Sequence, residues 1–264
     1  DAADQYAKHI PPAVIAHMLD LPLDDGEIFR DFIHTALEGI AEDQEVRQAG
    51  WQKLDAYLDQ RIAERSANLG DDLLSFLLTT EMGGHRLQPE HVRGTVALLL
   101  IAGIDTTWSG IGSSLWHLAS NSVDRRRLVE NPDMIPAAIE EFLRAYAPVT
   151  MARIVKEDME FHGVQMKQED WVLLPFPAAN RDDKQFANAH EVVIDREENR
   201  HAAFGLGIHR CLGSNLARLE LRVAVEVFIQ RFPQFELAEP SAVTWSLGQV
   251  RGPRKLPVRI TQRA

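Results

Sequence analysis

The most reactive side chain in the sequence is its single cysteine, Cys211, which lies in the glycine-rich segment FGLGIHRCLG at residues 204–213. A helix-periodic apolar segment follows directly, so we expect the thiol at the N-terminus of a helix. There, unpaired backbone N–H groups and the helix dipole favour thiolate over thiol. The glycines allow a tight turn and the close approach of a flat, bulky ligand. A lone cysteine excludes multi-cysteine metal sites and leaves three roles: an inert packed thiol, a nucleophile or a single metal ligand.

Two further groups of residues could take part in chemistry. Glu141 and Arg144 lie three positions apart on a predicted helix, a spacing that on a surface contributes only about 0.2–0.5 kcal/mol. The segment AGIDTT, residues 102–107, lies midway along a longer predicted helix, where a glycine costs about 1 kcal/mol relative to alanine. Its small residues permit either close packing of another helix or a local opening of this one.

The order Phe-x-x-Gly-x-x-x-Cys-x-Gly resembles the haem-ligand loop of the cytochrome P450 family of haem-thiolate monooxygenases. The resemblance implies that Cys211 is the axial thiolate of haem b (iron protoporphyrin IX), the ligand that favours O–O cleavage. It implies that His209 bonds a haem propionate and that Phe204 packs beside the thiolate. Gly207 and Gly213 complete the cofactor-binding loop.

Three other positions match the same family. Arg153, at the start of the first expected strand, matches a propionate-binding arginine of many bacterial members. Glu141 and Arg144 precede the cysteine loop by about the spacing of the family's structural Glu–Arg pair. The third partner of that pair is often an arginine on the chain before the cysteine, where Arg181 and Arg196 are both candidates.

The segment at residues 102–107 resembles the family's oxygen-activation signature. The resemblance implies that Thr106 holds a water or an oxygen species where the helix opens locally, and that Asp105 connects it to solvent protons. Seven residues are expected on the substrate side: Leu98, Ile101 and Ala102 on the long helix, Val149 and Met151 after Pro148, and Gln249 and Val250 in the tail.

The expected activity is the insertion of one oxygen atom from O₂ into a small or medium apolar substrate. The resemblance implies electrons from a ferredoxin or flavodoxin with its reductase. Arg200, Arg210, Arg218 and Arg222 outnumber Glu220 around the cysteine, which suggests either a docking patch for an acidic donor or merely scattered exposed arginines. Two alternatives stay open: a peroxide-driven haem-thiolate enzyme, and a truncated, non-catalytic helical protein with weak or no haem binding.

Composition narrows the classes of partner. The 264 residues contain 28 basic and 39 acidic side chains, a net charge of −11, which argues against a nucleic-acid binder. No run approaches the roughly 18–20 apolar residues of a membrane span. We therefore expect no membrane span in this segment and a cytoplasmic protein.

The elements that would position these residues are mostly helical. Periodicity predicts helices from Pro11, from Asp24, around residues 51–62, from Asp71, from Pro89 to before Asn121, and from Asn131 to before Ala147. Strands are predicted at residues 153–155 and 171–174 around a His162-Gly163 turn, and in the tail at residues 243–260. The last helix is predicted over residues 212–232, with an apolar stripe of Leu212, Leu216, Leu219, Val223 and Val227.

The predicted fold class is mainly α with a minor β region (α+β), and the resemblance implies a cytochrome P450 fold. No linker interrupts residues 1–264, so a single domain is expected. The family is longer than this chain, and the sequence begins without Met, inside a helical pattern. We therefore expect an N-terminally incomplete fold, equivalent to the C-terminal two-thirds of a P450 catalytic domain.

Overall fold

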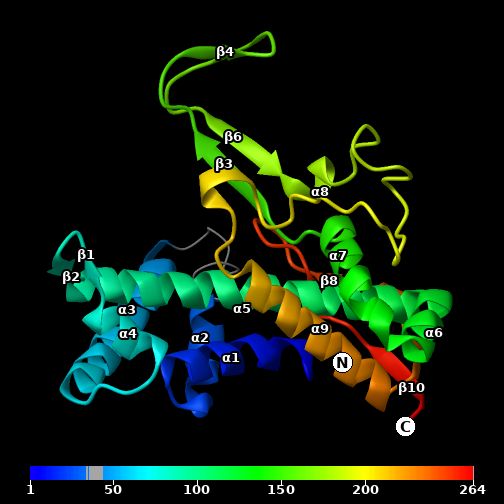
Figure 1. Cartoon of the computed structure of the whole chain (residues 1–264), viewed down its shortest axis with the longest axis horizontal. Helices are drawn as coiled ribbons and strands as arrows, with labels where there is room; N and C mark the ends of the chain where they lie inside the picture. Colours follow the sequence, from blue (N-terminus) through cyan, green and yellow to red (C-terminus); the bar gives the residue numbers. More distant parts are fainter. Residues whose placement is uncertain (34, 36–43, 264) are drawn as a thin grey trace. The chain divides into compact units, whose positions relative to one another are not determined.

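The long helix predicted from Pro89 is present as α5 (Pro89–Ser120), which Figure 1 shows as one uninterrupted coil. The computed structural model describes residues 1–33, 35 and 44–263. Two units are distinguished along the chain, Asp1–Trp108 and Ser109–Ala264, and the boundary falls within α5.

The first unit contains the predicted helices and one small hairpin. Its elements are the 3₁₀ turns Ala7–His9 and Leu23–Asp25, the helices α1 (Ile10–Leu19), α2 (Gly26–Ile33), α3 (Gln44–Ala67) and α4 (Leu73–Thr79), and the strands β1 (Glu81–Met82) and β2 (His85–Arg86). Asp72 caps α4 by accepting a hydrogen bond from the Ser75 amide at 2.9 Å, as its position before an apolar run predicts. The glycines after Met82 form the β1–β2 turn, with φ values of +64° and +81°.

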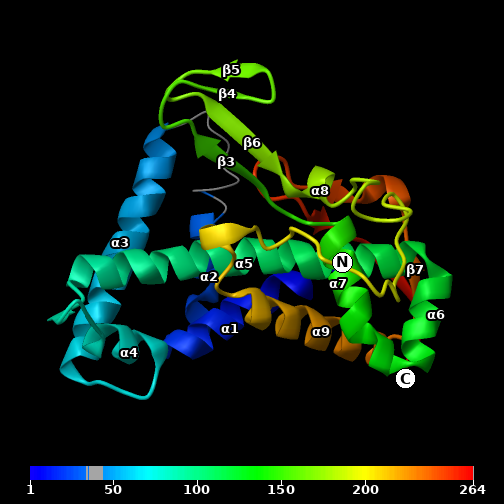
Figure 2. The same cartoon turned by 45° about the horizontal axis from the view of Figure 1, so that its top comes forward.

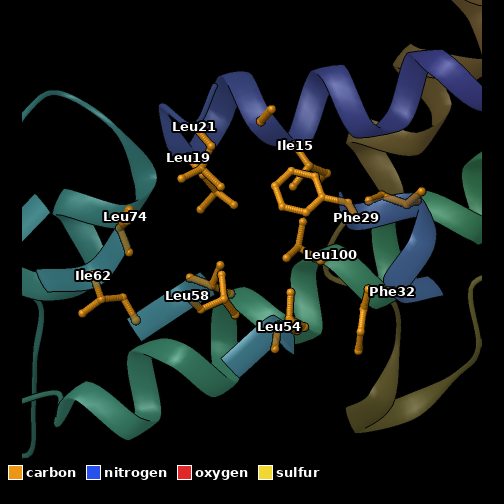
Figure 3. Close-up of a cluster of buried hydrophobic side chains, with 14 of the residues drawn as sticks. Ile15, Leu19, Leu21, Phe29, Phe32, Leu54, Leu58, Ile62, Leu74 and Leu100 are labelled. Carbon is orange, nitrogen blue, oxygen red and sulfur yellow. The ribbon is translucent and has the colours of Figure 1, made fainter. Parts of the chain in front are cut away.

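The core of the first unit is built from one apolar stripe of each helix. Figure 3 shows these side chains converging between the helices. The members that are almost fully buried include Ile15, Leu19, Phe29, Leu54, Leu58, Leu74 and Leu100. The predicted periodicity of α3 is therefore confirmed at Leu54, Leu58 and Ile62, whereas Trp51 stays 37% exposed and packs edge-on against Phe32.

The second unit combines helices with paired strands. Its helices are α6 (Ser122–Glu130), α7 (Ile135–Ala145), α8 (Phe176–Ala179) and α9 (Ser214–Arg231), with 3₁₀ turns at Pro132–Met134, Gly207–His209 and Pro240–Ala242. Its strands are β3 (Thr150–Ile154), β4 (Met159–Phe161), β5 (Val164–Met166), β6 (Trp171–Pro175), β7 (Gln234–Leu237), β8 (Thr244–Trp245), β9 (Pro253–Lys255) and β10 (Val258–Gln262). The mainly helical class with a minor β content is confirmed.

The strand pairing refines the expectation for residues 150–175. β3 and β6 pair antiparallel, with Ala152 opposite Leu173. The predicted turn at His162-Gly163 closes a separate inner hairpin, β4–β5, which Figure 2 shows beyond the end of the β3–β6 pair. Helix α6 was not predicted, because Ser122–Glu130 carries three consecutive arginines and no clear apolar period. Strand β7 was not predicted either.

The predicted apolar stripe of α9 is wrong. Leu212, Leu219, Val223 and Val227 are exposed and Leu216 is half-buried. The face that packs inside the unit is the adjacent one, formed by Leu221, Ala224, Val225, Phe228 and Ile229. Both faces carry apolar residues at helical spacing, so periodicity alone could not decide between them.

This correction predicts unequal costs for truncating the two faces of α9. Phe228 is 4% exposed and its ring packs edge-on against Phe232 and Phe235, so Phe228→Ala should reduce the free energy of unfolding by about 3–5 kcal/mol. Val223 is 47% exposed, so Val223→Ala should change it by less than about 0.5 kcal/mol. Urea unfolding followed by circular dichroism measures both, and equal costs would contradict the assignment of faces.

Glu220 is an acidic residue on the buried side of α9. It is 8% exposed, and its Oε2 atom has no hydrogen-bond partner among the described residues. Burial raises the pKa of Glu220 to about 7. Since a buried carboxylate without a partner is costly, the folded protein favours the protonated carboxyl.

The raised pKa of Glu220 predicts a loss of stability with rising pH. The folded pKa exceeds the ordinary value of 4.5, so the cost is absent below about 4.5 and complete above about 7, where it is on the order of 3 kcal/mol. Glu220→Gln should remove this part of the pH dependence and stabilise the protein at alkaline pH. Urea unfolding at a series of pH values measures it, with Glu226→Gln on the same helix as the control. An unchanged slope in Glu220→Gln would contradict the prediction.

By length and composition, α5 could cross a membrane, and it is the one helix of the described residues that passes this test. Half of its most apolar window is buried inside the structure. The buried core helix of a water-soluble protein meets the same criterion.

Candidate functional site

The cysteine loop is a closed turn that leads into α9. The Cys211 amide donates to the Phe204 carbonyl at 2.8 Å, and this bond closes the loop. Gly205 and Gly207 have φ values of +69° and +67°, a left-handed conformation that residues with a Cβ adopt rarely. The loop geometry therefore favours glycine at both positions, of which Gly207 belongs to the motif and Gly205 does not.

The Cys211 thiol is free and exposed. Its Sγ lies beside Gly213, the N-cap residue of α9, since a Cβ at position 213 would stand 4.0 Å from the sulfur. This confirms the predicted placement of the thiol at the start of a helix. Among the described residues nothing packs over the thiol, which disfavours the inert packed thiol of the three roles left open.

Exposed apolar side chains lie in the same loop as this thiol. Leu206, Ile208 and Leu212 are 73%, 97% and 95% exposed. Within the described residues, neither His209 nor Arg153 has a carboxylate partner; Arg153 donates only to the Ala152 carbonyl at 2.8 Å. The groups that a ligand could use in the second unit are thus the Cys211 thiol, the His209 imidazole, the Arg153 guanidinium and exposed apolar surface.

This donor set fits a haem. Thiolate is an axial ligand of haem iron, exposed apolar side chains suit the flat macrocycle, and an imidazole and a guanidinium suit its two carboxylates. At Gly207, an added Cβ would meet no atom within 4 Å, so the space beside the loop is open to a large group. The residues present are therefore compatible with the cofactor that the sequence motif implies.

A buried ion cluster lies on α7, behind the loop. Arg144 donates from Nε and Nη2 to the two oxygens of Glu141, both at 2.8 Å, and both side chains are 0% exposed. Burial alone would raise the pKa of Glu141, but hydrogen bonds from Arg144, the Val193 amide and Arg196 hold it below the usual glutamate range. The pair is therefore a buried, charge-assisted cluster and not a surface pair.

The third partner of the cluster is Arg196. Its Nε lies 3.0 Å from Glu141 Oε2, whereas Arg181 donates to the carbonyls of Pro177 and Ala145. Asn199 also donates to Glu141 at 3.0 Å, a contact that the sequence analysis missed. No local signal could have found it, because 58 positions separate the two residues.

Arg144 also fixes the course of the chain before the cysteine loop. Its Nη1 donates to the carbonyls of Asn180 and Ala189 at 2.8 and 2.7 Å, and its Nη2 to that of Glu191 at 2.6 Å. Its guanidinium also lies over the Phe186 ring. One buried side chain thus holds three backbone positions of a segment that has little regular structure of its own.

In the first unit, the expected oxygen-activation residues lie in continuous helix. α5 is uninterrupted across residues 102–107, so the predicted local opening is not present in this structure. The Thr106 hydroxyl donates to the Ala102 carbonyl at 2.6 Å, the usual back-bonding of a threonine inside a helix. Asp105 is 1% exposed, so its carboxylate is not in direct contact with solvent.

The expected substrate-side residues of the second unit lie together. Val149 and Val250 form an antiparallel bridge, and the Gln249 side chain lies 3.5 Å from the Met151 sulfur. The nearby Gly252 packs so closely on Ser109 that no Cβ would fit. In the first unit, Leu98 and Ala102 are exposed and Ile101 is half-buried on α5.

The predicted arginine patch is smaller than expected. Arg200, Arg210 and Arg222 are exposed, but Arg218 is paired with Glu140 at 2.6 Å. The acidic residue weighed against the patch, Glu220, is buried.

Comparison with known proteins places the whole chain in one family. The model of the family described as Cytochrome P450 matches residues 39–244. Polyketide biosynthesis cytochrome P450 PksS of Bacillus subtilis is 32% identical over 99% of this chain and 66% of its own length. The solved structure of PksS covers 99% of this chain and 69% of its own chain, with a TM-score of 0.94.

Two other relatives have nearly the same coverage. Mycinamicin IV hydroxylase/epoxidase of Micromonospora griseorubida is 34% identical, and nocardicin C N-oxygenase of Nocardia uniformis is 36% identical, each over 98% of this chain and 66% of its own length. The chain spans about two thirds of the length of the curated relatives that it matches. On the family match, the identity and the shared fold together, this chain belongs to the cytochrome P450 family.

Proposed function

We propose that this protein is a haem-thiolate monooxygenase that inserts one oxygen atom from O₂ into an organic substrate. The observation that carries the proposal is the exposed Cys211 thiol at the start of α9, in a loop that two left-handed glycines shape. Relatives named as a hydroxylase/epoxidase and an N-oxygenase support this class of reaction. We further propose that residues 1–264 act within one P450 catalytic domain.

The cofactor of the proposed reaction is haem b, which supplies the redox-active iron that activates O₂. Cys211 would hold it as axial ligand, with Phe204, Gly207 and Gly213 shaping the loop around the sulfur. His209 and Arg153 would hold its carboxylates, because both are cations or donors without an acidic partner among the described residues. Since Cys211 must stay a reduced thiol before the cofactor binds, we propose a cytoplasmic location.

Thr106 and Asp105 are the proposed proton-transfer residues. To act, the Thr106 hydroxyl has to give up its bond to the Ala102 carbonyl and hold a water instead. The Asp105 carboxylate is buried, so passing a proton from solvent requires its side chain to rotate or a water to enter. Both movements are small changes at one turn of α5.

The proposed substrate is an apolar organic molecule of medium size. The expectation of a small substrate gains no support from the relatives, which are named for polyketide biosynthesis, mycinamicin IV and nocardicin C. Seven residues are proposed to face it: Leu98, Ile101, Ala102, Val149, Met151, Gln249 and Val250. Gln249 is the polar member of this set, and its amide, which donates to the Met151 sulfur here, would orient a substrate hydroxyl or carbonyl by exchanging that contact.

The proposed electron donor is an acidic ferredoxin or flavodoxin with its reductase. Arg200, Arg210 and Arg222 are exposed near the thiolate side of the second unit, in a chain with a net charge of −11. A local positive surface on an acidic protein steers an acidic partner toward that surface.

The thiolate assignment has a direct spectroscopic test. We expect the purified protein to bind one haem per chain and, when reduced under carbon monoxide, to show the strongly red-shifted Soret band of thiolate ligation. Cys211→Ser should lose this band, and in the haem-free protein it should change the free energy of unfolding by less than about 0.5 kcal/mol, because the side chain is exposed. A wild-type protein that lacks the band or binds no haem would overturn the proposal and favour a non-catalytic helical protein.

The proton-transfer role predicts uncoupling. Thr106→Ala should keep consuming O₂ while the product formed per O₂ falls about tenfold or more, because the hydroxyl that holds the water is gone. Thr106→Ser keeps the hydroxyl and serves as the matched control. Product and O₂ are measured in the same reaction. Full coupling in Thr106→Ala, together with turnover supported by peroxide alone, would favour the peroxide-driven enzyme.

The docking patch predicts a salt-dependent reduction rate. Reduction by an acidic ferredoxin should slow about tenfold as salt screens the arginines, and Arg210→Glu should slow it at low salt. Arg126→Glu makes the same change of charge on α6 and should leave the rate unchanged. Stopped-flow reduction measures all three proteins, and a salt-independent rate would count against the patch.

A further inference from the structure

Three aromatic side chains of the second unit form a row of ring contacts. Trp116 of α5 lies in the middle, edge-on to Tyr146 at the end of α7, with 5.6 Å between the ring centroids. It also lies edge-on to Trp245 of β8, with 5.4 Å between the centroids. Such contacts stabilise packing, and they also bring neighbouring π systems close enough to exchange electrons.

Tyr146 ends this row with a hydroxyl whose partner is a base. The hydroxyl lies 2.8 Å from His117 Nδ1, and Nε2 of the same imidazole lies 2.8 Å from Asp124 Oδ2. A carboxylate only accepts, so Nε2 carries the hydrogen and Nδ1 is left as the acceptor from Tyr146. Burial raises the pKa of Tyr146 to about 12, so the hydroxyl keeps its proton and donates it to this bond.

The base is itself held in place. His117 and Asp124 are 6% and 8% exposed, so water competes little for their hydrogen bonds. Asn121 donates from Nδ2 to Asp124 Oδ2 at 3.0 Å, and the Phe142 ring packs on the imidazole with 5.0 Å between centroids. The hydroxyl, the imidazole and the carboxylate therefore form a fixed line of hydrogen bonds.

This line is suited to the coupled loss of an electron and a proton. A phenol that loses one electron becomes a strong acid, so its proton moves to a base that is already in hydrogen-bond contact. At 2.8 Å, His117 Nδ1 is within the roughly 2.6–3.2 Å over which a positioned base takes a proton. Asp124 stabilises the imidazolium that forms, as a carboxylate does behind a catalytic histidine.

The other end of the row lies beside the proposed substrate side. Ser246, the residue after Trp245, donates to the Val250 carbonyl at 2.8 Å. The Arg251 guanidinium lies over the Trp245 ring, 5.2 Å from its centroid. A positive charge there disfavours a radical cation on this ring. An electron vacancy that reaches Trp245 is therefore passed on toward Tyr146, where a proton can leave.

We propose that Tyr146 is a redox-active tyrosine whose proton passes to His117. Trp116 and Trp245 relay its electron to a strong one-electron oxidant. The Tyr146 O–H bond breaks and an N–H bond forms at Nδ1, which gives a neutral tyrosyl radical and an imidazolium. A one-electron reductant of the ascorbate class reverses both transfers. The row thus draws oxidising equivalents away from the substrate side, where the Met151 sulfur is itself oxidisable.

Tyr57, in the first unit, is a natural comparison. Its hydroxyl donates to the Asp25 carboxylate at 2.7 Å, and the Arg61 guanidinium lies over its ring, 5.1 Å from the centroid. The cation disfavours loss of an electron from this ring. Arg61 also donates to Asp25 at 2.9 Å, which makes that carboxylate a weaker proton acceptor. A second hydrogen-bonded tyrosine therefore has surroundings that disfavour the same step.

The inference rests on the proposed function only for the source of the oxidant, and its test supplies a different one. The purified protein is oxidised by photo-excited tris(bipyridine)ruthenium with persulfate, frozen at once and examined by electron paramagnetic resonance. The wild type should give the signal of a neutral tyrosyl radical. Of the three tyrosines in the chain, Tyr146→Phe should lose this signal and Tyr57→Phe should keep it.

Further variants separate the proton acceptor and the row from general packing. His117→Gln offers an acceptor that cannot take the proton, so the radical yield should fall about tenfold or more. Asp124→Asn should lower the yield in the same way and replaces the glutamine variant if that variant does not fold by circular dichroism. Trp116→Phe interrupts the row and should lower the yield. Trp171→Phe, which removes a 71% exposed tryptophan outside the row, should not.

No tyrosyl signal in the wild type, or an equal signal in Tyr146→Phe, would overturn the inference. So would full yield in both His117→Gln and Asp124→Asn, or equal yields in Trp116→Phe and Trp171→Phe. The expected pattern in a protein that lacks the red-shifted carbon monoxide band would overturn the haem assignment and leave the redox-active tyrosine standing. The two proposals therefore fail in distinguishable ways.

Discussion

The second unit depends on keeping the charge of Glu141 paired while fully excluding it from water. An isolated carboxylate at 0% exposure would cost several kcal/mol, and removing one partner from a buried pair costs about 3–5 kcal/mol. Arg144, Arg196, Asn199 and the Val193 amide together satisfy this carboxylate. Because the partners come from an irregular segment, satisfying one charge also determines where that segment runs.

Helices α7 and α9 both make contacts that hold the cysteine loop in place. α7 supplies two adjacent carboxylates that point to different partners, Glu141 to the chain before the loop and Glu140 to His201 and α9. α9 contributes its N-terminus beside the thiol and buries one face, which includes Phe228, inside the unit. Its other face carries Leu219, Val223 and Val227 at 47–54% exposure, so the helix is apolar on more than one side.

Signals within a few residues predicted where helices begin. Contacts between distant residues determine which face of α9 is buried and which arginine binds Glu141. Pro89 and the Asp72 cap mark helix starts through interactions within four residues, so these boundaries were predictable. The buried face of α9 was not, because its two apolar faces are equivalent until a partner helix covers one of them. The choice of Arg196 over Arg181 depends on a contact across 55 positions.

The site shows the same limit. The sequence of the cysteine loop predicted a tight turn at its glycines and a helix directly after it, since both are local properties of the backbone. The 3.1 Å contact between His201 Nε2 and Glu140 was not predictable, because 61 positions separate the two residues and each looks like an ordinary surface residue in the sequence. For α5, the motif at residues 102–107 was recognised, but the burial of Asp105 depends on the packing around it.

The partners of α7 also set an order of events during protein synthesis. Arg196, a partner of Glu141, is synthesised 55 residues after it, and Arg218, a partner of Glu140, is synthesised 78 residues after it. At about 5–20 residues per second, α7 is synthesised several seconds before these two arginines. Until then Glu141 has only Arg144 of its own helix as a cationic partner, and Glu140 has neither His201 nor Arg218. The cysteine, which is made between the two arginines, is therefore fixed in place only as the last charge of α7 is neutralised.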